Sequence, residues 1–289
     1  MKLTIANGCF SKRFGEAKAF EMIKKAGFDG VDYSMYGLTD TYNMLTDDYK
    51  EKAQKTKELL EKYNLSCEQA HAPFSFTYED GIGENHERYK EIVRSIEYAS
   101  IIGCKNLVVH YIKYKLPYDV DFVKCSLDFY NSFIPYLEKA GVKICVENLF
   151  RRSPVRKVYG DYLCDPHRHL EFMEKLDDRY FNICLDIGHT AASGYSPEET
   201  IRVLGKKIAV THIQDTDYLE DCHMPPYTMK QNWEEIIKAF AESGYEGNIS
   251  LEIPGLFKKL PDELVAAGLS FAQATGRYIV NEIIKLREE

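Results

Sequence analysis

Residues that bind metal ions or move protons follow six of the apolar, strand-like segments of this chain. In FNICLDIGHT (181–190), an apolar run ends at Asp186, and His189 comes three residues later. The other candidates are His71, His110, Glu147, His212 and Glu252 at the ends of such runs, and His223 in the loop after His212. The remaining histidines are His86, His167 and His169, which we predict to lie on the surface. A single histidine at a strand end is more often structural than a ligand, so the prediction of a site depends on the candidates occurring together.

A ring of carboxylates and imidazoles on one rim indicates a metal site. Buried close together, these groups would repel one another or lose their hydration at a cost of several kcal/mol. A divalent cation would offset that cost. Mixed histidine and carboxylate ligands suit Mn²⁺, Zn²⁺, Co²⁺ or Fe²⁺, and suit Mg²⁺ less well. We therefore predict a bound divalent metal ion and leave its identity open among Mn²⁺, Zn²⁺, Co²⁺ and Mg²⁺.

The elements that would position these residues alternate along the chain. Short apolar runs rich in β-branched residues predict strands at 3–8, 30–34, 66–72, 106–111, 143–149, 182–188, 208–214 and 248–253. Helical periodicity predicts helices near 16–26, 48–63, 86–102, 120–139, 166–176, 197–205, 232–242 and 262–285. No G-x-G-x-x-G loop follows the first strand, so a Rossmann sheet lacks its phosphate loop. We predict an α/β fold, a single (β/α)₈ TIM barrel over residues 1–289, whose strands end on the active-site face.

Several helix ends carry recognisable signals. Glycine follows the predicted helices in KKAGFDG (24–30), EKAGVK (138–143) and ESGYEG (242–247), where it suits a left-handed cap. SPEET (196–200) predicts a helix with Ser196 as its N-cap and proline in its first turn.

The composition is that of an ordinary globular chain. The residues are 45% hydrophobic and 28% charged, and the formal net charge of −8 argues weakly against non-specific nucleic-acid binding. The first ten residues lack a long apolar stretch, so we expect no signal peptide. No stretch of the sequence approaches the roughly 18 uncharged apolar residues that a membrane span needs, so we expect no span. The eight cysteines contain no C-x-x-C pair, and a reducing cytoplasm is the simplest setting for them.

The motifs at the strand ends resemble those of the xylose isomerase-like barrels, a superfamily that includes D-tagatose 3-epimerase, hydroxypyruvate isomerase and endonuclease IV. The resemblance covers nearly the whole chain. Its motifs are HAPF (71–74), VVHY (108–111), CVEN (145–148), CLDIGHT (184–190), THIQD (211–215), DCH (221–223) and LEIP (251–254). Each motif alone is weak, but seven in order indicate the superfamily without identifying a substrate.

The resemblance to the epimerase branch implies a set of roles. The metal ligands of that branch fall on Glu147, Asp186, His212 and Glu252 of this chain. Glu147 and Glu252 would also be the catalytic pair, one removing a proton beside a carbonyl and the other returning one on the opposite face. The metal would stabilise the enediolate between these steps. His189 is similar to a ligand of a substrate oxygen.

The chain also departs from that branch. No arginine follows His212 within a few residues, and no further glutamate follows Glu147 closely. Arg151 and Arg152 could bind a phosphate or a sugar acid, or they could be a pair of solvated loop residues.

The nuclease branch offers an alternative with more ligands. Endonuclease IV-like members bind three zinc ions through nine residues, and the counterparts here are His71, His110, Glu147, Asp186, His189, His212, Asp221, His223 and Glu252. His71, His110, His189, Asp221 and His223 would then bind substrate or further metal ions. Aromatic and proline residues replace the glycine-rich turns of those nucleases in this chain, which disfavours nucleic acid as the partner.

We predict a cytoplasmic, metal-dependent sugar or sugar-phosphate isomerase or epimerase acting through an enediolate. The alternatives are an endonuclease IV-like phosphoesterase, a related sugar dehydratase and a non-catalytic sugar-binding barrel. The expected partner is a small sugar or sugar phosphate. Exposed apolar residues on the last helix would favour a homo-oligomer.

Overall fold

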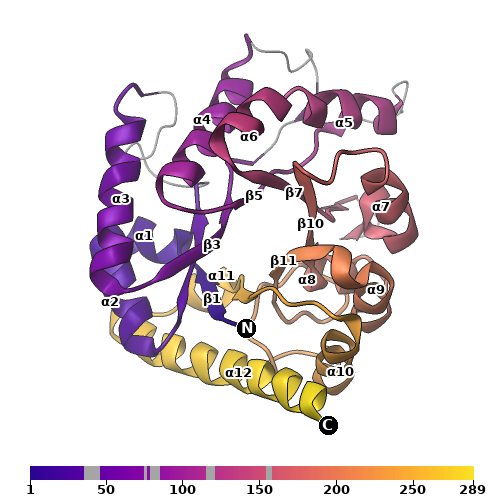
Figure 1. The fold of residues 1–289 in the computed structure, drawn as a ribbon. Coiled ribbons are helices and arrows are strands. Elements are labelled where there is room, and N and C mark those ends of the chain that lie inside the picture. Colours follow the sequence, from indigo (N-terminus) through magenta and orange to yellow (C-terminus); the bar gives the residue numbers. More distant parts are fainter. Residues whose placement is uncertain (36–45, 75–76, 79–84, 115–120, 154–157) are drawn as a thin grey trace.

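The core of the fold is a barrel of eight parallel strands (Figure 1). The computed structural model describes residues 1–35, 46–74, 77–78, 85–114, 121–153 and 158–289. The barrel strands are β1 (Leu3–Ala6), β2 (Gly30–Ser34), β3 (Ser66–His71), β5 (Asn106–Val108), β7 (Lys143–Glu147), β10 (Phe181–Asp186), β11 (Ile208–His212) and β12 (Ile249–Leu251). They follow the order β11-β10-β7-β5-β3-β2-β1-β12, and a bridge between Ile213 and Leu251 joins the two ends. The predicted TIM barrel is confirmed.

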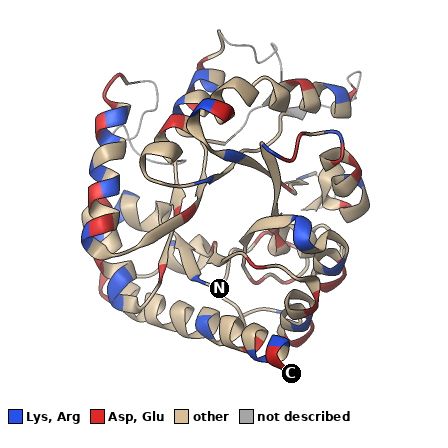
Figure 2. Cartoon of the chain, in the orientation of Figure 1, with Lys and Arg blue, Asp and Glu red and all other residues tan. Residues whose placement is uncertain are grey.

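Helices surround the strands, and charged residues lie along these outer helices (Figure 2). The outer helices are α2 (Glu16–Ala26), α3 (Tyr49–Tyr63), α4 (Glu87–Ile101), α5 (Phe122–Asn131), α6 (Ile134–Ala140), α7 (Pro166–Met173), α9 (Pro197–Leu204), α10 (Trp233–Ser243) and α12 (Asp262–Glu288). Shorter elements are α1 (Gly8–Phe14), α8 (Ile187–Ala192), α11 (Pro254–Phe257), η2 (Tyr162–Cys164) and η3 (Gly205–Lys207). Two small sheets pair β4 (Thr77–Tyr78) with β6 (Lys113–Tyr114), and β8 (Phe150–Arg151) with β9 (Tyr159–Gly160).

The predicted helix 120–139 is two helices in the structure. Residue 120 lies outside the described residues, α5 ends at Asn131, and α6 begins at Ile134. Pro135 stands in the first turn of α6. Proline has no N–H to donate and suits the first turn of a helix rather than its interior, which accounts for the new start.

The predicted helix ends are confirmed at the residues named. Gly27, Gly141 and Gly244 end α2, α6 and α10 in the left-handed conformation, with φ of +96°, +65° and +72°. The Ser196 side chain accepts a hydrogen bond from the Glu199 N–H at 3.1 Å and caps α9. The three glycine caps let α2, α6 and α10 end shortly before the strands that follow them, and Ser196 fixes the start of α9.

The barrel interior is partly apolar and partly polar. Val108, Cys145, Cys184 and Val210 form a small buried cluster from four neighbouring strands. Asp32 on β2 is also buried and accepts a hydrogen bond from Gln69 Nε2 at 2.9 Å. All eight cysteines are free thiols, so no disulfide constrains the barrel. Among the described residues, no helix is long and apolar enough to cross a membrane.

His169 is buried on α7, and its prediction as a surface residue was wrong. Helix α7 turns one face toward the barrel, and His169 lies on that face with Phe172. Burial lowers the pKa of His169 to about 4, because an imidazolium would lose its hydration there.

This burial predicts an acid-sensitive contribution to stability. The unfolded chain protonates His169 near pH 6.5, whereas the folded protein keeps it neutral down to about pH 4. Unfolding therefore takes up a proton in this window, and the folded state loses stability as the pH falls. Between pH 7 and pH 5, the unfolding free energy of His169→Leu should decrease by about 2 kcal/mol less than that of the wild type. Urea unfolding at both pH values measures it.

The same substitution at His167, which is exposed on the same helix, should leave the pH dependence as in the wild type. An identical pH dependence in His169→Leu and the wild type would contradict the prediction.

Candidate metal centre and active site

The nine predicted site residues lie together at the carboxyl ends of the barrel strands. His71, Glu147, Asp186 and His212 are the last residues of β3, β7, β10 and β11, whereas His110 and Glu252 follow β5 and β12. His189 lies on α8, and Asp221 and His223 lie in the loop between β11 and α10. A cavity of about 230 Å³ opens onto seven of these residues, with Asp186 and His212 buried beneath it.

Glu147, Asp186, His212 and Glu252 form the central group. Their ligand atoms all lie within 4.8 Å of one another. His212 Nδ1 is 2.9 Å from Glu147 Oε1 and 3.5 Å from Glu252 Oε2. Three carboxylates and one imidazole nitrogen around a common point make a suitable ligand set for a divalent cation.

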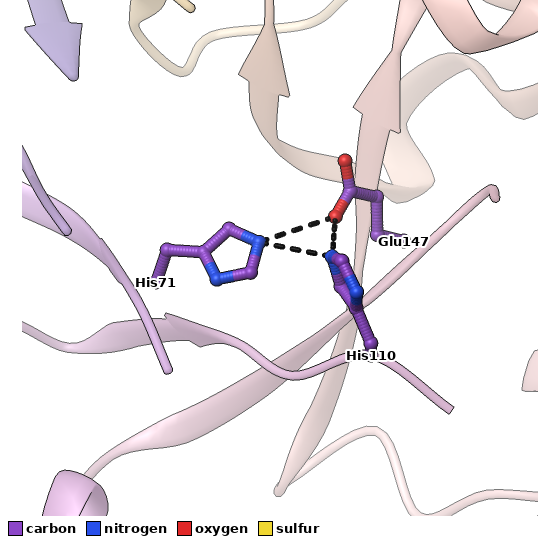
Figure 3. A group of neighbouring side chains, drawn as sticks. All are labelled: His71, His110 and Glu147. Carbon is purple, nitrogen blue, oxygen red and sulfur yellow. Dashed lines mark hydrogen bonds and ion pairs between the residues drawn. The ribbon is translucent and has the colours of Figure 1, made fainter. Parts of the chain in front are cut away.

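A second group joins His71 and His110 to the other oxygen of Glu147 (Figure 3). His110 Nε2 is 2.8 Å from Glu147 Oε2, and His71 Nε2 is 3.4 Å from the same oxygen. The two Nε2 atoms are 3.0 Å apart. Glu147 therefore faces the central group with one oxygen and the histidine pair with the other.

His189, Asp221 and His223 form a third group on the other flank. His223 Nε2 is 3.0 Å from Asp221 Oδ2, and His189 Nε2 is 3.8 Å from Asp221 Oδ1. Their ligand atoms also lie within 4.8 Å of one another. The structure thus brings all nine predicted residues into three adjoining groups.

Backbone carbonyls fix the tautomer of three of these histidines. Nδ1 of His71, His189 and His223 lies 2.7–2.9 Å from the carbonyl oxygens of Ala72, Asn148 and Glu252 respectively. A carbonyl only accepts, so each Nδ1 carries the hydrogen. In a neutral ring, each Nε2 then has a free lone pair that points at a carboxylate of the site, which is the arrangement that metal-binding histidines use.

His212 is oriented the other way by Asp32, a residue that sequence reasoning missed. Its Nε2 lies 3.2 Å from Asp32 Oδ2 inside the barrel, and its Nδ1 faces the central group. Asp32 is in turn held by Gln69. A carboxylate behind a ligating histidine fixes the ring and raises its basicity.

Gln214, also missed from the sequence, links the central and third groups. Its Nε2 donates to both oxygens of Asp186, at 3.1 and 3.3 Å, and to Asp221 Oδ1 at 3.0 Å. Its Oε1 accepts from the His223 N–H at 2.7 Å. Gly188 leaves the space for this side chain, because a Cβ there would lie 2.3 Å from Gln214 Cδ.

A buried carboxylate organises the loop that carries Asp221 and His223. Asp215 accepts hydrogen bonds from the indole of Trp233 at 3.0 Å and from four backbone N–H groups between residues 216 and 231. His223 itself has a left-handed backbone with φ of +48°. Such strained residues occur often at functional sites, where the surrounding contacts hold them.

Burial and mutual charge shift the pKa values of the site. Burial and the charges of Glu147 and Glu252 raise the pKa of Asp186 to about 6. Burial alone would raise the pKa of Glu147 and Glu252, but neighbouring histidines, His212 foremost, hold both below their usual range. Burial would lower the pKa of His223, but Glu252 and Asp221 raise it to about 10. In the absence of a metal ion, protons on His189, His212 and His223, whose pKa values are raised, therefore compensate the carboxylates, and the donor set fits a cation in their place.

Arg151 and Arg152, which follow β7, each form an ion pair within the protein. Arg151 Nε lies 2.8 Å from Asp161 Oδ2 in a largely buried ion pair. Arg152 Nη1 lies 2.7 Å from Glu220 Oε2. Arg151 is therefore not the solvated loop residue that the sequence suggested.

The barrel and its ring of candidate ligands define a (β/α)₈ barrel protein with a candidate metal centre at the carboxyl ends of its strands. The chain belongs to the xylose isomerase-like TIM barrel family, whose sequence profile matches residues 20–274. The resemblance predicted from the motifs is confirmed.

Individual relatives show how far the likeness extends. An uncharacterized protein of Mycobacterium tuberculosis is 24% identical over 273 residues, which cover 88% of this chain and 91% of that protein. A D-tagatose 3-epimerase-like protein of known structure superposes with a TM-score of 0.73 at 22% identity, over 100% of this chain and 98% of its own. A D-psicose 3-epimerase, solved in the presence of D-fructose, has a TM-score of 0.75 at 14% identity, over 96% and 99%. At these identities, the solved structures establish the fold alone.

Proposed function

We propose that this protein is a divalent-metal-dependent isomerase or epimerase of a sugar or sugar phosphate. The observation that carries the proposal is the central group, in which Glu147 and Glu252 converge with Asp186 and His212 below a small cavity. The names of the structural neighbours, D-tagatose 3-epimerase-like protein and D-psicose 3-epimerase, support the same class of reaction.

The two glutamates have the properties of a proton-transferring pair. Both line the cavity, and both have lowered pKa values, so both are ionised at neutral pH and able to accept a proton. They come from β7 and β12, which are separated by β10 and β11 around the barrel. One would remove the proton next to the carbonyl, and the other would return a proton from its own side.

The remaining residues of the central group would hold the metal. Asp186 and His212 are fully buried and lie outside the cavity lining, which suits ligands better than bases. A divalent ion on these four residues would supply the positive charge that stabilises the oxygens of an enediolate.

Deuterium exchange with and without metal tests the proposal. Chelator-treated protein should be inactive, and added Mn²⁺ should restore incorporation of solvent deuterium at the carbon next to the carbonyl of a ketose substrate. A panel of ketopentoses, ketohexoses and their phosphates in D₂O, followed by NMR, measures it. A metal-loaded protein that exchanges none of these sugars would contradict the proposal.

The second candidate is a metal-dependent phosphoesterase of the endonuclease IV kind. It is favoured by the second and third groups, each a separate ligand set beside the central one. Metal analysis after loading with Zn²⁺ separates the candidates: three ions per chain with cleavage of duplex DNA at abasic sites would support the phosphoesterase. One ion per chain with sugar exchange supports the isomerase or epimerase.

A further inference from the structure

A second cavity opens beside the metal centre, toward β1 and β12. It has a volume of about 310 Å³ and shares Phe74, His223 and Glu252 with the cavity above the central group. A ligand whose reacting carbons lie near Glu252 can therefore extend into this second cavity.

Two lysines line the second cavity. Lys12 is on α1, and Lys258 directly follows α11. Both are exposed, and among the described residues neither has an ion-pair partner. Glu252 is the acidic residue in the lining, and its charge is directed to His212 and His223. Within the described part of the chain, the two lysines therefore give this end of the site a positive charge that no ion pair neutralises.

The backbone that presents the two lysines is tied together. Arg13, next to Lys12, donates to the carbonyl oxygens of Phe257 at 3.3 Å and Leu260 at 2.7 Å, which flank Lys258. Arg13 also pairs with Asp262. The rings of Phe10 and Phe257 pack edge to face at 4.6 Å between the same two elements. These contacts fix the positions of the two lysine-bearing segments relative to each other. The guanidinium of Arg13 is already bound to these partners.

The rest of the lining near the lysines is neutral. Burial raises the pKa of Cys9 to about 12, against a smaller opposing effect of the Lys258 and Arg13 charges, so its thiol remains protonated. Apart from Glu252 and His223, which it shares with the metal centre, the cavity is therefore an uncharged recess with two ammonium groups in its lining.

We propose that this second cavity binds the terminal phosphate of a phosphorylated ketose. A phosphate monoester carries between one and a half and two negative charges at neutral pH, which two lysines match, whereas a carboxylate would leave one lysine uncompensated. Lysine binds phosphate as a compact charge with three donors. The inference rests on the proposed function, because it places the reacting carbons of the same sugar at Glu147 and Glu252.

Paired substrates test the phosphate site. The Mn²⁺-loaded protein should exchange deuterium into D-ribulose 5-phosphate or D-fructose 6-phosphate with a kcat/KM at least about 100-fold above that for the sugar without phosphate. Lys12→Met and Lys258→Met should each lower kcat/KM for the phosphate by about 10- to 100-fold, mainly through KM. Both variants should leave the unphosphorylated sugar unaffected. Lys259→Met, next to Lys258 but outside the lining, is the matched control and should behave as the wild type.

A binding measurement separates failure of this site from failure of the proposed function. Inorganic phosphate should bind chelator-treated wild-type protein in calorimetry and should bind the double variant Lys12→Met, Lys258→Met at least about tenfold more weakly. If no sugar exchanges but the double variant loses phosphate binding, the proposed function fails and the anion site stands. Unchanged phosphate binding in the double variant would overturn the site, as would equal kcat/KM for both members of a substrate pair. Tighter binding of D-gluconate than of phosphate would indicate that the cavity binds carboxylates, and it would overturn the proposed phosphate site.

Discussion

Glu147→Gln should lower the rate of deuterium exchange by on the order of 1,000-fold at saturating Mn²⁺. Glutamine keeps the size and one oxygen of the side chain but loses the charge and the ability to accept a proton. Glu147 is also the residue that the central group and the His71–His110 pair share, through Oε1 and Oε2 respectively. Its charge balances histidines in both groups, so the substitution removes the proposed base and also changes the charge balance of both groups.

The control for Glu147→Gln is the same change at Glu68. This residue also lies on a barrel strand, β3, but its side chain is half exposed and pairs with Lys2 away from the site. Glu68→Gln should exchange deuterium at the wild-type rate. A Mn²⁺ titration of both variants separates loss of metal from loss of the base. Undiminished exchange in Glu147→Gln at saturating Mn²⁺ would remove it from the catalytic role.

The strands of this barrel could be predicted from the sequence because parallel strands covered on both sides are nearly continuous apolar runs. The residues at which these strands end could not be predicted. The run that forms β5 continues through Val109 and Tyr111, yet the strand ends at Val108. Residues past the strand end turn over the rim and remain buried, so hydrophobicity does not distinguish them from the strand. The same effect hid α8, whose six residues are all buried.

The meeting of the candidate ligands at one rim could be predicted because most of them end a strand or follow one closely, and Asp221 and His223 lie in the loop after β11. Parallel strands around one barrel bring their carboxyl ends to one rim, so a local sequence feature becomes a spatial cluster. The residues that orient the candidate ligands do not share this position at a strand end. Asp32 stands in the middle of a strand and acts on His212, which is distant in sequence. Gln214 is an uncharged residue whose role depends on the space that Gly188 leaves. Contacts across a barrel depend on register and twist, which the local sequence does not specify.

The role of Asp32 leads to the prediction with the next largest effect. Asp32→Asn should weaken Mn²⁺ binding by about 10- to 100-fold, the usual effect of losing a carboxylate behind a ligating histidine. The ring of His212 requires Nδ1 as its free nitrogen, since Nδ1 faces Glu147 and Glu252. The Asp32 carboxylate favours hydrogen on Nε2 and so keeps Nδ1 available. An amide in its place can present its NH₂ group and favour the opposite tautomer.

Asp32 would orient His212 rather than bind the metal ion itself. The recovery of deuterium exchange at high Mn²⁺ concentration distinguishes these two roles. Asp32 does not line the cavity, so excess Mn²⁺ should restore most of the exchange rate in Asp32→Asn, whereas it should not in Glu147→Gln. Asp29→Asn is the matched control, because Asp29 precedes the same strand but pairs with Arg277 on the outside of the barrel. A Mn²⁺ affinity in Asp32→Asn equal to that of the wild type and of Asp29→Asn would contradict the prediction. Loss of exchange that persists at saturating Mn²⁺ would instead place Asp32 in the chemistry itself, as a partner in the proton transfers of the site.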